Sequence, residues 1–157
     1  MKSTILLTTG TTRFDTLVYA VINDSVSFGL NSFIIQSPSI KNIEINCDCE
    51  KFEYVDNIES YVNKCEIIIT HAGAGNVYRL LENTSITKKI IVVPNLERKD
   101  KHQADLARFI EEKRYAFVCW DVNEIYTAID IAVNYFERQP YSKVSFFKSS
   151  DILKDIL

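Results

Sequence analysis

Short apolar runs alternate along this chain with segments whose apolar residues recur every three or four positions. A short apolar run predicts a strand buried on both faces, and the longer spacing predicts an amphipathic helix. Strands are predicted at 4–9, 32–36, 66–70, 89–93 and 116–120. Helices are predicted at 14–26, 57–65, 76–81, 100–114 and 122–138. This alternation indicates an α/β protein in which helices cover both faces of a parallel sheet.

Segment 41–56 is the least regular part of the chain. Ile43 and Ile45 alternate with polar residues, and Phe52 and Tyr54 do so more weakly, so one or two short strands are expected there. The chain has no internal repeat and no low-complexity linker. We therefore predict a single Rossmann-like domain over residues 1–140.

Residues 141–157 are predicted to form a C-terminal amphipathic tail. Apolar residues recur there at helical spacing, at Ile152, Leu153, Ile156 and Leu157. An apolar stripe of this kind needs cover from other apolar surface. The tail either packs on its own domain or docks on a partner chain.

Composition and charge narrow the possible classes of function. The 157 residues are 46% hydrophobic and 25% charged, as in an ordinary soluble domain, and the formal net charge is -3. An acidic chain argues against nucleic acid as a partner, because binding phosphates needs a basic surface. No apolar run approaches the length of a membrane span, and the N-terminal run is too short for a signal peptide. We expect a cytoplasmic protein with reduced thiols.

No metal site is expected. Cys47 and Cys49 lack the second close pair of Cys or His residues that a structural zinc site requires. The cysteines are interpreted as ordinary core or surface side chains.

The glycines mark one edge of the predicted sheet. Three of the four glycines, Gly10, Gly73 and Gly75, follow predicted strands, whereas Gly29 follows a predicted helix. Ligands of open parallel sheets bind beyond the carboxyl ends of the strands. The glycines therefore predict a ligand site at that edge.

The strongest local motif lies after the strand at 66–70. It consists of small residues that follow a histidine and open a helix: His71, Ala72, Gly73, Ala74, Gly75 and Asn76. Small residues let a ligand approach the backbone, and free N–H groups at a helix start favour phosphate. The motif has no third glycine of a dinucleotide fingerprint and no P-loop lysine. It is either a phosphate site or a plain tight turn, and His71 either contacts the ligand or is structural.

Two further loops follow predicted strands. Thr8–Thr12 is rich in hydroxyl groups, and Thr11 or Thr12 either caps the next helix or contacts a phosphate. The charged loop 94–101 leads into the third candidate segment. His102 and Gln103 lie there in the first turn of a predicted helix, where they can contact a ligand.

Taken together, these segments resemble the small donor-binding subunit of two-part glycosyltransferases. They also resemble the C-terminal half of the peptidoglycan N-acetylglucosaminyltransferase, a GT-B enzyme of glycosyltransferase family 28. The matching motifs, in order, are Thr9–Asp15, Thr70–Gly75, Ile91–Asn95 and His102–Ala107. In bacteria, similar small subunits take part in capsule and exopolysaccharide assembly.

The resemblance implies a catalytic subunit that binds a UDP-sugar as substrate and needs no cofactor. Transfer would be inverting, with an acceptor hydroxyl attacking the anomeric carbon as the diphosphate leaves. A membrane-anchored partner subunit would bind a polyprenyl-diphosphate-linked acceptor and hold this chain at the inner face of the membrane. The chain lacks the Asp-x-Asp triplet of metal-dependent glycosyltransferases, so no metal is expected. The sequence offers no candidate for the general base, which can lie on the partner.

The resemblance also assigns roles to single residues. Gly73, Ala74 and Gly75 would face the diphosphate, with His71 beside them. Gly10 and Thr11 would line the same cleft. His102 and Gln103 match the pair that contacts the donor sugar or the nucleoside.

One position departs from the family pattern. Family members commonly carry a glutamate four residues after the last glycine of the loop, where it accepts hydrogen bonds from ribose. This chain has Arg79 there, which has no acceptor. A second hypothesis follows from that departure, namely a non-catalytic Rossmann-like partner that stabilises another transferase. An unrelated nucleotide-binding regulator is a third hypothesis, which explains fewer of the motifs.

Overall fold

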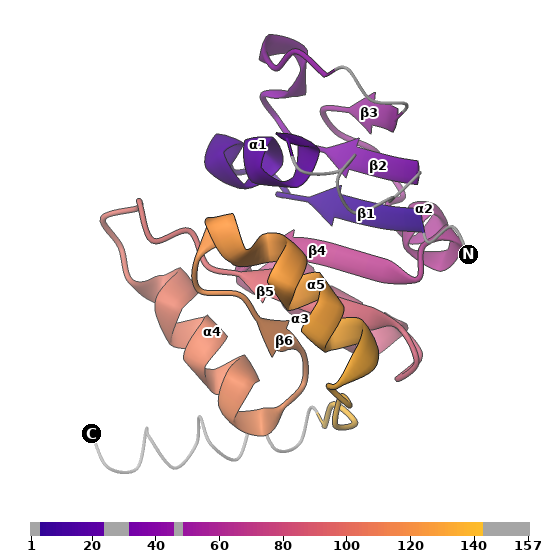
Figure 1. Cartoon of the computed structure of the whole chain (residues 1–157), viewed down its shortest axis with the longest axis vertical. Coiled ribbons are helices and arrows are strands. Elements are labelled where there is room, and N and C mark those ends of the chain that lie inside the picture. The colour runs from indigo at the N-terminus through magenta and orange to yellow at the C-terminus, as the bar shows by residue number, and fades with distance from the viewer. Residues whose placement is uncertain (1–3, 24–31, 46–48, 143–157) are drawn as a thin grey trace.

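Six parallel strands form one sheet in the order β3-β2-β1-β4-β5-β6 (Figure 1). The computed structural model describes residues 4–23, 32–45 and 49–142. The strands are β1 (Thr4–Thr8), β2 (Ser32–Gln36), β3 (Cys49–Phe52), β4 (Ile67–His71), β5 (Lys89–Val93) and β6 (Phe117–Val118). The α-helices are α1 (Asp15–Asn23), α2 (Glu59–Lys64), α3 (Ala74–Asn83), α4 (His102–Lys113) and α5 (Ile125–Asn134). The described residues also form two 3-10 helices, η2 (Ile40–Asn42) and η3 (Val122–Glu124).

The sheet separates two hydrophobic cores because successive strand residues point to opposite faces. On one face, Ile5 and Leu7 pack with residues of α1 and α5. On the other face, Leu6 packs with residues of α2, α3 and α4. The central strands β1, β4 and β5 are buried almost throughout, so their sequences are continuous apolar runs. The predicted α/β architecture is confirmed.

The strand order reverses direction at the pair formed by β1 and β4. β1 pairs with β2 on one side and with β4 on the other, and Thr8 lies opposite both Gln36 and Thr70. The chain leaves β1 toward α1 on one face of the sheet, and it leaves β4 toward α3 on the opposite face. Such a reversal opens a crevice at the carboxyl ends of the two strands.

The predicted elements differ from the structure mainly in the irregular segments. Segment 41–56 contains one of the one or two short strands predicted there, β3, but Ile43 is not part of it, because Ile43 closes the 3-10 helix η2 by donating its backbone N–H to the carbonyl of Ile40. The last predicted helix, 122–138, begins as η3 and ends at Asn134. Beyond that end, Arg138 turns inward, and its guanidinium binds backbone carbonyls.

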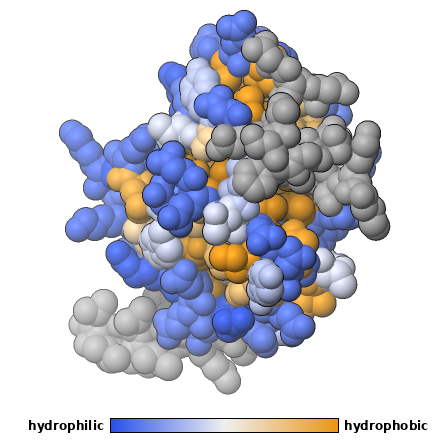
Figure 2. All heavy atoms as spheres, viewed as in Figure 1, coloured by the Kyte–Doolittle hydropathy of each residue, from blue (hydrophilic) through white to orange (hydrophobic). Residues whose placement is uncertain are grey.

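The face seen in Figure 2 is mostly hydrophilic, and apolar side chains show between the polar ones. The first residue of the predicted tail packs against the domain. The centroid of the Tyr141 ring lies 5.1 Å from that of Tyr115 and 6.0 Å from that of Tyr78. The apolar residues predicted to form the tail helix lie outside the described residues. Among the helices of the described ranges, none combines the length and the apolar character needed to cross a bilayer.

Two cations hold the amino-terminal edge of the sheet through carbonyl groups. The Lys88 ammonium donates to the carbonyls of Val62, Asn63 and Cys65 and so closes the end of α2. Arg138 is 7% exposed, and its burial lowers its pKa to about 10, so it stays charged at neutral pH.

We predict that Arg138→Met destabilises the fold by about 3 kcal/mol, because it leaves several carbonyls without a donor. The guanidinium of Arg138 donates to the carbonyls of Tyr115, Ser85 and Lys88. Thermal or chemical unfolding measures the loss. Arg108→Met is the control, because the Arg108 side chain is 65% exposed and its ion pair contributes little. Equal stability of the two variants would contradict the prediction.

Candidate functional site

Buried polar side chains gather at one edge of the sheet. In the described part of the chain, every buried polar or charged residue except Arg138 lies at or just beyond the carboxyl end of a strand or at the start of α4. These residues are Thr8, Thr9, Gln36, Ser37, Ser39, Thr70, His71, Asn95 and Gln103. Burying polar groups costs free energy unless they are hydrogen-bonded, so a concentration of buried polar side chains at one edge indicates a functional site. It coincides with the crevice between β1 and β4.

The first turn of α3 offers backbone donors at this edge. Helix α3 begins at Ala74, and its N-cap residue Gly73 supplies no side-chain cap. The N–H groups of Ala74, Gly75 and Asn76 therefore have no acceptor within the helix. A Cβ atom on Gly75 would meet no atom within 4 Å, so the space above this turn is open. Backbone donors and the helix dipole together favour an anion there.

The His71 side chain lies between the loops that contain Gly10 and Gly73, and it explains why a larger residue would not fit at either position. It is the last residue of β4 and is 6% exposed. A Cβ on Gly73 would come within 2.2 Å of His71 Nε2, and a Cβ on Gly10 within 3.0 Å of His71 Cε1. The imidazole ring thus occupies the space that glycine leaves on both sides. This packing gives His71 a structural role, and a ligand contact from it stays a prediction.

His71 is neutral at physiological pH. Burial lowers its pKa from 6.5 to about 4, and the positive charge of Arg98 acts in the same direction. Arg98 belongs to the loop between β5 and α4, so that loop lies near enough to act on the same site. The Nδ1 atom of His71 and the hydroxyl of Thr9 are buried without a hydrogen-bond partner in the described structure. A neutral imidazole can serve this site as a donor or an acceptor but not as a cation.

The loop after β1 is held by a residue that the sequence did not single out. Gly10 has a φ of 63°, and both its N–H and its carbonyl bind the side chain of Gln36, at 2.9 and 2.8 Å. Helix α1 begins only at Asp15, so the interpretation of Thr11 or Thr12 as its cap is wrong. Gln36 is a buried polar residue directly after the apolar run Phe33–Ile35, and that exception to the pattern is the signal that could have identified it.

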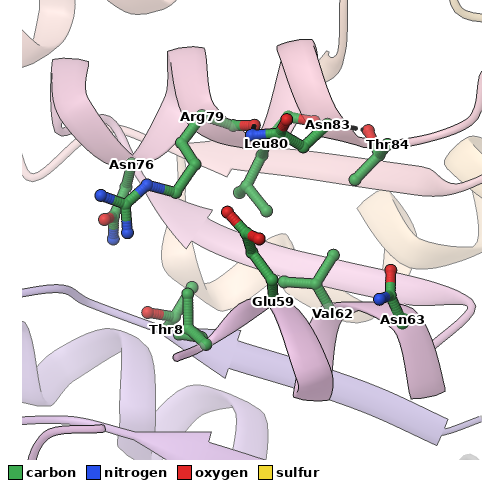
Figure 3. Close-up of a pocket in the computed structure, with 10 residues that line it drawn as sticks. Thr8, Glu59, Val62, Asn63, Asn76, Arg79, Leu80, Asn83 and Thr84 are labelled. Carbon is green, nitrogen blue, oxygen red and sulfur yellow. Dashed lines mark hydrogen bonds between the residues drawn. The ribbon is translucent and has the colours of Figure 1, made fainter. Parts of the chain in front are cut away.

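Two adjoining cavities form a groove beside these loops. One, of about 190 Å³, lies between α2 and α3 (Figure 3), and the other, of about 160 Å³, reaches Gly10 and Thr11. The residues shared by both are Thr8, Ile58, Asn76 and Arg79.

The groove combines a cation, polar groups and an apolar wall. Arg79 is exposed and lines both cavities, and Glu59 lines the first cavity with it (Figure 3). Tyr54, 60% exposed, lines the second cavity. The described residues hold no group of three His, Cys, Asp or Glu side chains that could bind a metal ion. The groove is therefore suited to an organic ligand with an aromatic ring and hydroxyl groups, next to an anion at the start of α3.

The third predicted segment lies at the start of α4. The Gln103 side chain is buried, and its Oε1 accepts the backbone N–H of Asn95 at 2.9 Å, which leaves its Nε2 donors for another partner. His102 is exposed, and its backbone N–H binds Asp100. Neither residue lines the two cavities.

The structure brings four of the predicted residues into one cluster, namely Gly10, His71, Gly73 and Asn76. Thr11 lines the adjoining cavity with Asn76. Ala74 and Gly75 lie in the open first turn of α3. Sequence reasoning missed the groove residues that come from α2, from the second half of α3 and from the segment after β3, because they carry no motif of their own; they include Tyr54, Ile58 and Glu59.

Comparison with known proteins identifies relatives of this chain. Residues 4–132 match the family model described as the glycosyltransferase family 28 C-terminal domain. The chain is 30% identical over 125 residues to the UDP-N-acetylglucosamine transferase subunit ALG13 of Homo sapiens, a match that covers 73% of this chain and 11% of that protein. The chain thus spans about a tenth of the human relative.

A bacterial relative and two solved structures agree with this match. The UDP-N-acetylglucosamine–N-acetylmuramyl-(pentapeptide) pyrophosphoryl-undecaprenol N-acetylglucosamine transferase of Wolbachia pipientis is 28% identical over 69% of this chain and 34% of its own length. The solution structure of ALG13 has a TM-score of 0.61 at 18% identity, covering 94% of this chain and 93% of that one. MurG of Acinetobacter baumannii has a TM-score of 0.53 at 15% identity, covering 89% and 49%. At these identities the two structures establish the fold.

The depressed pKa of His71 predicts a loss of stability in mild acid. Between its folded pKa of about 4 and its ordinary value of 6.5, the unfolded chain binds a proton that the folded chain does not. The free energy of unfolding therefore falls as pH drops through this window, by about 1.4 kcal/mol per pH unit. Chemical unfolding at pH 7.5, 6 and 5 measures the slope, and His71→Gln should flatten it. An equal slope in both proteins would contradict the prediction.

The two glycines of the α3 loop should respond differently to alanine. Gly73→Ala places a methyl group against the buried His71 ring and should cost about 2 kcal/mol or more of stability. Gly75→Ala enters open space at a helix start and should leave stability unchanged or raise it by up to about 1 kcal/mol. Parallel melting curves test the pair, and similar losses in both variants would show that His71 does not fill the space beside Gly73.

Proposed function

The chain belongs to the glycosyltransferase family 28 C-terminal domain family, and from that premise we propose that it is the donor-binding catalytic subunit of an inverting glycosyltransferase. Its donor would be a UDP-sugar, and N-acetylglucosamine is the sugar named in its relatives. The observation that carries the proposal is the open first turn of α3 beside the groove at the β1–β4 reversal. The same edge therefore offers an anion site and a cavity for a nucleoside.

The geometry supports one orientation for the donor. The diphosphate would lie on the N–H groups of Ala74, Gly75 and Asn76, where the helix dipole favours negative charge. The nucleoside would occupy the groove lined by Tyr54 and Arg79. The sugar would then extend toward the loop between β5 and α4, where His102 and the free Nε2 of Gln103 can bind its hydroxyl groups.

In this orientation the chain contributes to catalysis mainly by stabilising the leaving group. The acceptor hydroxyl attacks the anomeric carbon, the bond to the diphosphate breaks, and negative charge grows on the diphosphate. Preorganised backbone donors stabilise that charge more in the transition state than in the bound donor. Neutral His71 can add a hydrogen bond without a charge. We assign the general base to a partner chain.

We further propose that the partner is a membrane-anchored subunit that binds a polyprenyl-diphosphate-linked acceptor in surface polysaccharide synthesis. The human relative is named as a transferase subunit, and the name of the Wolbachia relative includes a lipid-linked acceptor. The chain would then work at the cytoplasmic face of the membrane. Residues 141–157 would form a tail that docks on the partner or packs on this domain.

One observation favours a second candidate, a non-catalytic subunit that stabilises another transferase. Arg79 places a donor-only side chain in the groove, next to where the ribose hydroxyls would lie. A domain that had lost its donor would not bind nucleotides even with the partner present. Nucleotide binding therefore separates the two candidates.

We predict that the full chain binds UDP selectively and that Gly75→Asp abolishes the binding. Asp fits the open space at Gly75, so the fold should stay intact while its charge repels the diphosphate. Gly75→Asn is the matched control, because it adds the same bulk without the charge and should weaken binding less.

Ligand-observed NMR against UDP, GDP and a panel of UDP-sugars measures this, first on the chain alone and then on the chain co-expressed with its partner. Unchanged binding by Gly75→Asp would overturn the phosphate assignment. The absence of nucleotide binding by both preparations would favour the non-catalytic subunit.

A further inference from the structure

The side chain of Gln36 has every hydrogen-bonding position of its amide occupied. Gln36 ends β2 and is 4% exposed. Its Oε1 accepts from the Thr8 hydroxyl at 2.5 Å and from the Gly10 N–H at 2.9 Å. Its Nε2 donates to the Gly10 carbonyl at 2.8 Å and to the Glu53 carbonyl at 2.6 Å. A primary amide has two donors and two acceptor sites, so none remains for a ligand.

These four bonds join the two walls of the groove. Gly10 and Thr11 form one wall of the second cavity, and Tyr54 and Val55, which follow Glu53, form another. Gln36 lies between them and lines the same cavity. One side chain therefore determines the position of the loop after β1 relative to the segment after β3.

The bonds also determine the backbone conformation of Gly10. Its φ of 63° is in the left-handed region, and both of its peptide groups bind Gln36. In this position Gly10 leaves room for the Asn76 side chain, because a Cβ there would come within 2.9 Å of Asn76 Nδ2. The loop is thereby placed against the first turn of α3, where the diphosphate is proposed to bind.

A second contact from the segment after β2 holds the far end of the same loop. The Ser39 hydroxyl donates to the carboxylate of Asp15, the first residue of α1, and Arg13 binds the other oxygen at 2.6 Å. Partial burial raises the pKa of Asp15, but the bonds from Ser39 and Arg13 outweigh that effect and hold it below its usual value. The loop from 9 to 15 is thus attached at both ends to the residues that end and follow β2.

We propose that Gln36 is a positioning residue of the donor site, which holds the Gly10 loop and the Tyr54 segment at the separation that a nucleotide diphosphate requires. The inference rests on the proposed function, because it assumes that a nucleotide occupies this groove. All polar positions of the Gln36 amide are used within the protein, so Gln36 acts through the Gly10 and Glu53 carbonyls and not by a hydrogen bond to the ligand.

The test compares Gln36→Glu with Gln36→Leu in the full chain. In Gln36→Glu, one carboxylate oxygen can still accept hydrogen bonds from the Thr8 hydroxyl and the Gly10 N–H. The other oxygen takes the place of the amide nitrogen and, without a proton, repels the carbonyl oxygens of Gly10 and Glu53. UDP affinity should fall by about tenfold or more at pH 7.5. Burial raises the pKa of a carboxyl group, so acidification toward pH 5.5 should protonate it and restore one donor. The ratio of variant to wild-type affinity should then return toward one. Gln36→Leu should bind weakly at both pH values.

Lys88→Met is the matched control. It removes several hydrogen bonds at the opposite edge of the sheet and should lower the melting temperature while leaving UDP affinity unchanged. Equal affinity of wild type and Gln36→Glu at pH 7.5 would overturn the proposal. An equal loss in Lys88→Met would also overturn it, because the effect would then be one of general stability.

A second measurement separates this inference from the proposed function. The exchange rate of the Gly10 amide proton reports its bond to Gln36 without any ligand. It should rise at least about tenfold in Gln36→Leu and stay unchanged in Lys88→Met. Failure of the wild type to bind UDP, with faster Gly10 exchange in Gln36→Leu, would refute the proposed function while retaining the loop-holding role. Unchanged exchange in Gln36→Leu would refute the positioning role itself.

Discussion

The parallel pairing of β1 with β4 is the constraint on which the site depends. Both strands end at the same edge, and their following helices pack on opposite faces of the sheet. The backbone therefore diverges between Gly10 and Gly73, and a crevice opens where the N–H groups of α3 have no partner. The groove, the glycine loops and the buried histidine all occupy this one place because the strand order reverses there.

The polar groups buried at the two edges of the sheet find their hydrogen-bond partners in different ways. At the amino-terminal edge, Lys88 and Arg138 use their charges to bind backbone carbonyls. At the carboxyl edge, the buried side chains are neutral, and Gln36 satisfies its whole amide through its neighbours. His71 and Thr9 are the exceptions, each with a buried atom that lacks a partner. Unsatisfied groups at that edge are consistent with a site that a ligand completes.

The proposed chemistry relies on preorganised backbone groups. An open helix start stabilises charge on a leaving diphosphate without moving, because glycine and alanine keep side chains away from it. The loop after β1 is held by Gln36 at the end of β2 and by Ser39 just after it, and the loop after β4 is held by the His71 ring between two glycines. Binding specificity would then depend on the groove, where Arg79 supplies a cation and Tyr54 an exposed aromatic ring.

Hydrophobic patterning alone determined the strands at 32–36 and 89–93, because the centre of a strand buried on both faces must be apolar. It also placed Gly10, Gly73 and Gly75 at one edge, since parallel strands end together. The pattern failed at Ile43, where local backbone bonds form a 3-10 helix, and beyond Asn134, where α5 has already ended. Only the tertiary structure brings Gln36 to Gly10 and seats His71 between two loops. Those contacts join residues from separate strands, and hydrogen bonds between such residues leave no periodic trace in a sequence.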